Sequence, residues 1–137
     1  MGLVYENITL TNTIDLGFFN RGVIKKSEVR KKQVQAMVDT GAYTLVITDE
    51  VRQDLGLAVE REKLVRMANK TSEMCKVTEP VTIQWNNRTS VTQAIILPGT
   101  SEVLLGAIPL EEMDVMVDPY NQKLVGVHGD EIIHKVY

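Results

Sequence analysis

The chain has 137 residues, of which 44% are hydrophobic and 24% charged, as in an ordinary globular protein. This length fits one domain that buries a core without disulfides, so we expect a single domain over residues 1–137. The formal charge of −3, from 18 acidic and 15 basic side chains, gives no reason to expect a nucleic-acid or anionic membrane partner. No apolar stretch approaches the roughly 18 residues that span a bilayer, and the N-terminal segment lacks the pattern of a signal peptide. We therefore expect a cytoplasmic protein.

Residues that often bind metals or act as thiol nucleophiles are scarce. Cys75 is the only cysteine, so an internal disulfide is impossible, and a small buried hydrophobe is a better interpretation than a catalytic thiol. The only histidines, His128 and His134, both lie near the C-terminus. This scarcity argues against zinc, and we expect neither a metal nor a cofactor.

In the first half of the chain, short runs of β-branched residues alternate with turn residues, which predicts strands. Before Asp39, apolar residues alternate with Lys and Gln, the period of a half-buried strand. Thr48 offers an N-cap oxygen and Gly56 a C-terminal stop, so a helix of about two turns is predicted between them. The predicted strands here are 4–11, 29–38 and 44–47, with a loop over 12–22.

The second half continues the same pattern. A hairpin is predicted with its tip at residues 69–72, and Asn86-Asn87 predicts a second hairpin turn. Pro98-Gly99 breaks the following strand, and a second short helix is predicted over 108–113. The predicted strands are 64–68, 74–84, 91–97, 103–105, 115–117, 123–127 and 132–136. The whole pattern predicts a mainly β fold, a closed barrel or sandwich with one or two short helices.

Asp39-Thr40-Gly41-Ala42 lies between two strongly apolar runs. A carboxylate in that position faces a desolvation penalty unless it is hydrogen-bonded or functional. Gly41 allows a sharp turn and the close approach of a ligand or a second backbone. The plainer interpretation is a turn in which Asp39 accepts backbone N–H bonds. Two other Asp-x-Gly triplets, beginning at Asp15 and Asp54, lack both the central hydroxyl residue and the flanking apolar strands.

The stretch Val38–Ala42, with its apolar neighbours, resembles the active-site loop of the retropepsin-like aspartic proteases. Residues 103–119, an apolar-apolar-Gly sequence before a short helix, resemble the family element that packs behind this loop. Residues 64–69 resemble the approach to the flap hairpin. The resemblance runs in family order from about Val4 to Val127, and it is closest to small, stand-alone prokaryotic members. It implies a closed β-barrel and an aspartic-type endopeptidase, a hydrolase.

Aspartic proteolysis needs two carboxylates that share a water, one as general base and one as general acid. This chain has one credible loop, whereas pepsin-like enzymes encode two in a chain more than twice as long. The second carboxylate is therefore expected from a two-fold related copy, in a homodimer with the site on its axis. The implied partners are a peptide or protein substrate and a second copy of the chain.

The resemblance also implies roles for single residues. Asp39 and its symmetry mate would activate water, Thr40 would hydrogen-bond across the dimer axis, and the Gly41 carbonyl would accept from the substrate backbone. Ala42 would help hold the carboxylate through its N–H and is also expected to be a substrate-binding residue. The flap tip lacks the glycine of many relatives, and Asn69 is the residue there that tolerates positive φ. The flap residues expected to bind substrate are Ala68, Asn69, Lys70 and Thr71.

Other apolar side chains are expected to form general core rather than a specificity pocket. Trp85 is expected to cap a sheet edge or lie at an interface. The predicted C-terminal strand either interleaves across a dimer or ends in solution. The expected core residues are Leu45, Ile47, Ile83, Ile95, Leu97 and Leu105.

Two alternatives to the active homodimer remain open. One is a catalytically silent peptide-binding or dimerisation module with the same fold, which loss of activity on Asp39→Asn separates from an enzyme. The other is a monomer that pairs with a different protein, which the mass in solution tests. The apolar-flanked Asp39 favours activity, because a binding module has no need of it.

Overall fold

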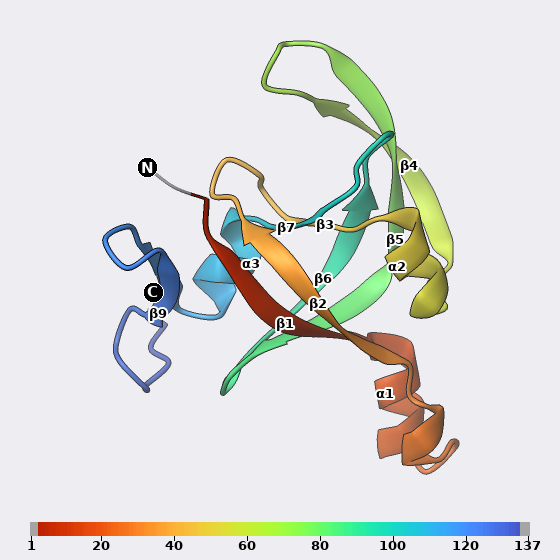
Figure 1. Cartoon of the computed structure of the whole chain (residues 1–137). Coiled ribbons are helices and arrows are strands. Elements are labelled where there is room, and N and C mark those ends of the chain that lie inside the picture. The colour runs from red at the N-terminus through yellow and green to blue at the C-terminus, as the bar shows by residue number, and fades with distance from the viewer. Residues whose placement is uncertain (1–2, 135–137) are drawn as a thin grey trace.

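A computed structural model describes residues 3–134, and these fold around a closed β-barrel (Figure 1). The sheet order is β1-β2-β7-β3-β6-β5-β4, and β1 also pairs with β5, which closes six of the seven strands into a ring. Only β4 stays outside, paired to β5 alone. The predicted mainly β barrel is therefore confirmed. The strands are β1 (Tyr5–Asn12), β2 (Lys31–Val38), β3 (Leu45–Val46), β4 (Val59–Arg66), β5 (Ser72–Trp85), β6 (Arg88–Ile96), β7 (Val103–Leu105), β8 (Val115–Asp118) and β9 (Lys123–Gly126).

The helices are short and lie between strands. Thr48 caps α2 as predicted, accepting from the Val51 N–H at 3.1 Å, and Gly56 follows that helix with a φ of +62°. The second predicted helix, α3, is also present. No helix within residues 3–134 has the length and apolar character needed to cross a bilayer. The helices are α1 (Thr13–Asn20), α2 (Asp49–Asp54) and α3 (Ala107–Glu112), with a 3₁₀ turn η1 (Lys26–Glu28).

The loop predicted over residues 12–22 is wrong, because α1 occupies most of it. Asn12 caps the helix by accepting from the Asp15 N–H at 3.1 Å, and its own amide donates to the Leu55 carbonyl at 2.9 Å. The Asp15 carboxylate pairs with both the Nε (2.8 Å) and Nη2 (2.9 Å) of Arg30. The helix is thus fixed by contacts with residues far along the chain, and the fold has one short helix more than predicted.

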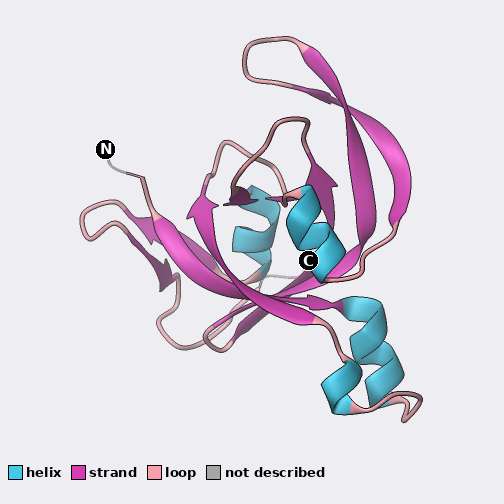
Figure 2. Ribbon diagram, turned by 45° about the vertical axis from the view of Figure 1, so that its right-hand side comes forward, coloured by secondary structure: helices cyan, strands magenta, loops and turns pink. Residues whose placement is uncertain are grey.

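The hairpin of β4 and β5 projects from the barrel and arches over its end (Figure 2). Strand β5 belongs to both the hairpin and the barrel. Its first half pairs with β4, and its second half pairs with β6 and β1 in the barrel. A register shift between Val77 and Pro80 separates the two halves, where proline's missing N–H is tolerated. Strand β4 begins at Val59, five residues before the predicted start.

The interior is apolar, and five of the six predicted core residues are buried, namely Leu45, Ile47, Ile83, Ile95 and Leu105. Cys75 is also buried, as predicted, and burial raises the pKa of its thiol. A thiol in that state is inert rather than nucleophilic.

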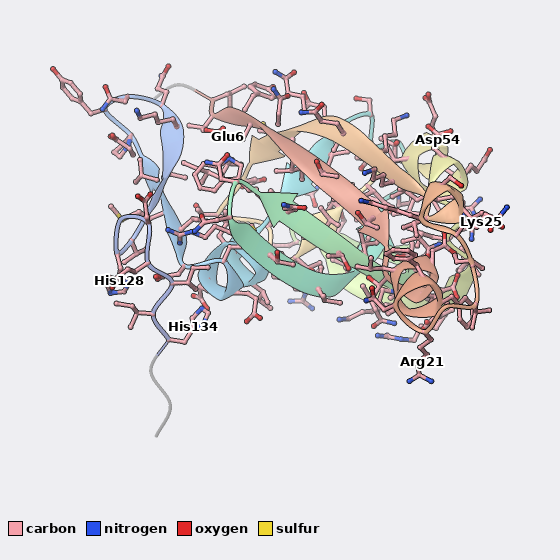
Figure 3. The ribbon with its side chains drawn as sticks, turned by 90° about the horizontal axis from the view of Figure 1, so that it is seen from below. Glu6, Arg21, Lys25, Asp54, His128 and His134 are labelled. Atoms are coloured by element: carbon pink, nitrogen blue, oxygen red, sulfur yellow. The ribbon has the colours of Figure 1, made fainter. Side chains whose placement is uncertain are left out.

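The C-terminal hairpin of β8 and β9 packs beside the start of β1 (Figure 1). Glu6 on β1 accepts from the Leu124 N–H at 2.9 Å and from the half-buried Trp85 indole at 3.3 Å. Figure 3 shows Glu6 on this side of the barrel, with His128 and His134 on the segment that follows the hairpin. The strand predicted over residues 132–136 is absent at 132–134, and its last two residues lie outside the described part of the chain.

Candidate active site

Asp39 follows β2 directly, at the point where β2 runs parallel to β7. Its N–H donates to the Leu105 carbonyl at 3.0 Å, and its carboxylate Oδ1 accepts from the Gly41 N–H at 2.9 Å. Asp39 is half-buried, whereas Thr40 and Gly41 are exposed. The barrel therefore fixes the backbone of Asp39, and the loop itself orients the carboxylate.

The predicted role of Ala42 in this loop needs correction. The Ala42 N–H donates to the main-chain carbonyl of Asp39 at 3.1 Å and closes the turn. Gly41 supplies the N–H that binds the carboxylate. The Ala42 N–H is already used by the Asp39 main-chain carbonyl, so the carboxylate is bound by the N–H two residues ahead, as in an Asx turn.

Gly106 and α3 pack directly behind the loop, as the resemblance implied. The Ala107 N–H donates to the Ala42 carbonyl at 2.8 Å, and the Ile108 N–H donates to the Tyr43 carbonyl at 3.0 Å. A Cβ at Gly106 would lie 2.3 Å from the Thr44 carbonyl oxygen, closer than any side chain tolerates. Only glycine lets the two backbones approach this closely.

A hollow of about 310 Å³ opens beside Asp39 and runs beneath the flap. Its walls come from the loop after Asp39, from β3, from the flap and from the ends of β6 and β7, and they are mainly apolar. Ile95 is buried, as expected of a core residue, and it also lines this hollow, as does the half-buried Leu97, which we expected to be core. Its other apolar lining residues are Val46, Val65, Met67 and Leu104, and Tyr43 and Arg66 stand beside them.

These additional lining residues had no distinctive signal in the sequence. They come from segments that meet only when the barrel closes.

The flap tip differs in detail from the prediction. Lys70, rather than Asn69, has the positive φ of +67°, while Asn69 Oδ1 accepts from the Thr71 N–H at 3.1 Å and from its hydroxyl. The Met67 N–H donates to the Thr71 carbonyl at 2.8 Å and closes the turn. Of the four predicted flap residues, Ala68 lines the hollow, and Asn69, Lys70 and Thr71 do not. No three His, Cys, Asp or Glu side chains gather at a possible metal site anywhere in residues 3–134.

A protein-family model described as "gag-polyprotein putative aspartyl protease" matches residues 26–112. The match spans the Asp39 loop, the flap, and the Gly106 element with α3, which is well over half of the chain. The fold and the loop define a retropepsin-like aspartic protease domain. The chain belongs to this family of gag-type aspartyl proteases.

Two solved structures are similar to this chain. EIAV protease complexed with the inhibitor HBY-793 is 23% identical with a TM-score of 0.46, over 58% of this chain and 75% of that one. A retropepsin-like aspartic protease from Rickettsia conorii is 21% identical with a TM-score of 0.48, over 86% of this chain and 77% of that one. No curated protein matches the sequence.

Proposed function

We propose that this protein is an aspartic endopeptidase that acts as a homodimer, with one Asp39 from each chain. The observation that carries the proposal is the Asp39 carboxylate, held by the Gly41 N–H at the mouth of an apolar hollow beneath a hairpin. Its family, whose members are aspartic proteases, supports this reading.

The absence of a second carboxylate beside Asp39 in the described part of the chain supports the proposed homodimer. Within residues 3–134, no hydrogen bond or ion pair joins Asp39 to another carboxylate or to a cation. The reaction needs two carboxylates, and the exposed Thr40 and Gly41 leave this edge of the loop open to a second copy. A two-fold axis beside Asp39 would bring the second carboxylate to the first.

In the proposed reaction, the ionised carboxylate takes a proton from water as the water oxygen attacks the scissile carbonyl. The protonated carboxylate gives its proton to the forming oxyanion. The carboxylate that took the water proton then protonates the leaving amine as the C–N bond breaks, and the other carboxylate regains a proton from the collapsing gem-diol. The flap would close over the extended peptide, exclude water and add strand-like hydrogen bonds. Ala68 stands where it would meet the substrate.

The test is peptide hydrolysis by the wild-type chain and by Asp39→Asn, over a diverse library from acidic to neutral pH. Asparagine retains an oxygen for the Gly41 N–H, so the loop should keep its shape while losing the carboxylate. We expect cleavage by the wild type and none by the variant. No cleavage by a demonstrably dimeric wild type would instead favour the silent peptide-binding module.

Mixing the two forms tests whether two chains share one site. At fixed total concentration, an exchanged equal mixture should retain about one quarter of the wild-type activity, because only wild-type pairs carry two aspartates. A site complete within one chain, or shared with a different protein, would leave about one half. Sedimentation of the same samples gives the mass in solution.

The cytoplasmic location remains a prediction of the sequence.

A further inference from the structure

A second hollow, of about 160 Å³, adjoins the one beside Asp39. The two share Tyr43, Thr44 and Ile95 in their walls, so they are neighbours along the same groove. The second hollow differs in its charge, because Arg61 and Lys63 of β4 line it and no acidic side chain does.

These two basic side chains contact neutral groups and form no ion pair. The Lys63 Nζ lies 5.0 Å from the centre of the Tyr43 ring, and the Arg61 Nη2 donates to the neutral Gln93 amide oxygen at 3.1 Å. Within residues 3–134 no carboxylate forms an ion pair with either of them. The nearest link to an acid is indirect, through Gln93, whose amide nitrogen donates to Glu60. The hollow therefore offers positive charge to an incoming ligand.

The register of β4 explains how the two hollows follow one another. Arg61, Lys63 and Val65 lie on one face of the strand, since side chains alternate, and Lys63 pairs across the hairpin with the buried Cys75. Val65 faces the first hollow, and the two basic residues face the second. A substrate extended along the flap has the same two-residue repeat, about 6.6 Å, so alternate substrate side chains would enter adjacent hollows.

We propose that the second hollow is a subsite for an acidic side chain, two residues farther from the scissile bond than an apolar side chain held in the first. This selectivity rests on the proposed function, because it concerns the same groove. The two-fold axis would repeat both hollows on the other side of the scissile bond. The substrate class is therefore a peptide with an apolar residue near the cleavage point and Asp or Glu two positions outward.

The test compares peptides that carry Glu, Gln or Lys at the outer position and are otherwise identical. For the wild type, kcat/KM should favour Glu over Gln by roughly three- to tenfold, and Gln over Lys, because the charges are only partly desolvated. Added salt should reduce the preference. Lys63→Glu should weaken the preference for Glu and raise cleavage of the Lys peptide.

Lys76→Glu is the matched control. It makes the same charge change on the same hairpin, but Lys76 neighbours Cys75 in β5, points to the opposite face, and lines neither hollow. The order of the three peptides should be unchanged in this variant. An equal shift in both variants would show a general charge effect and overturn the subsite.

Binding to the Asp39→Asn chain, measured by the anisotropy of labelled peptides, tests the subsite without chemistry. Tighter binding of the Glu peptide, abolished by adding Lys63→Glu, supports it even if the wild type cleaves nothing. Equal affinity for the Glu and Gln peptides overturns it, whatever the activity. Asp39-dependent cleavage with no preference among the peptides would overturn the subsite and leave the proposed function standing.

Discussion

Replacing Gly106 with alanine should displace the loop that holds Asp39, because Gly106 packs against the back of that loop. The new Cβ would lie 2.3 Å from the Thr44 carbonyl oxygen, 2.6 Å from the Ala42 carbonyl oxygen and 2.7 Å from the Thr44 nitrogen. All three are backbone atoms, so no rotamer change relieves the contact. Restoring ordinary van der Waals separation requires a movement of about 1 Å between the loop and α3.

The expected loss of stability follows from these contacts. Overpacking of a well-packed core costs about 1–3 kcal/mol. The same movement strains the two bonds from Ala107 and Ile108 to the loop, each contributing about 1 kcal/mol. A total near 3 kcal/mol should lower Tm by roughly 10 °C in a chain of this size. If Asp39 is catalytic, a 1 Å displacement should also reduce kcat/KM by about 100-fold.

Thermal unfolding of Gly106→Ala and Gly17→Ala side by side tests this reasoning. Gly17 lies in α1 with nothing within 4 Å of an added Cβ, so the same change there should be neutral or should stabilise by up to about 1 kcal/mol. A Gly106→Ala chain with a Tm within about 2 °C of the wild type would refute the reasoning, because it would mean that the loop and α3 separate freely.

Two further predictions concern buried charge. Arg88 is buried and donates to the carbonyls of Met113, Asp114 and Gly129. Arg88→Leu leaves these acceptors unpaired, so it should lower the free energy of unfolding in urea by at least about 3 kcal/mol. A loss below about 1 kcal/mol would contradict this. Hydrogen bonds from Arg30 hold the pKa of the Asp15 carboxyl below its usual value. The pair therefore stabilises the fold fully at pH values above the pKa of the unfolded state, which is near 4. This stabilisation is lost as the pH falls through the lower pKa of the folded state. Asp15→Asn should therefore lower the free energy of unfolding by about 1–2 kcal/mol at pH 7, and by progressively less below pH 4. A difference from the wild type that does not change with pH would exclude the ion pair as its cause.

The strands were readable from the sequence because their signals are local. β7 begins and ends at the predicted residues because a continuous apolar run marks it, and Thr48 caps α2 as predicted because capping depends on near neighbours. α1 was not readable. Its cap, Asn12, and its acid, Asp15, are held by Leu55 and Arg30, and its eight residues include a glycine and two phenylalanines, which have little helical preference of their own.

The candidate site also has a part that the sequence predicts and a part that it does not. The loop was predictable because the Asp39 carboxylate is bound two residues away, by Gly41. The residue that binds it was misassigned, because Ala42 turns its N–H to a carbonyl instead. The walls of the hollow were not predictable. Ile95 and Leu97 have the pattern of ordinary core residues, and only barrel closure shows that they face the groove.

The Asp39 loop and the basic hollow differ in how much sequence change they tolerate. The Asp39 loop is built from consecutive residues and supported from behind by Gly106, so it tolerates little change. The basic hollow is built from separate segments, and Arg61 and Lys63 are exposed there. An exposed side chain on a flap strand can be exchanged at a cost of about 0.5 kcal/mol or less in stability. The charge preference that we propose for the groove can therefore change independently of the Asp39 loop, so the loop motif can indicate the class of protein without indicating its substrate.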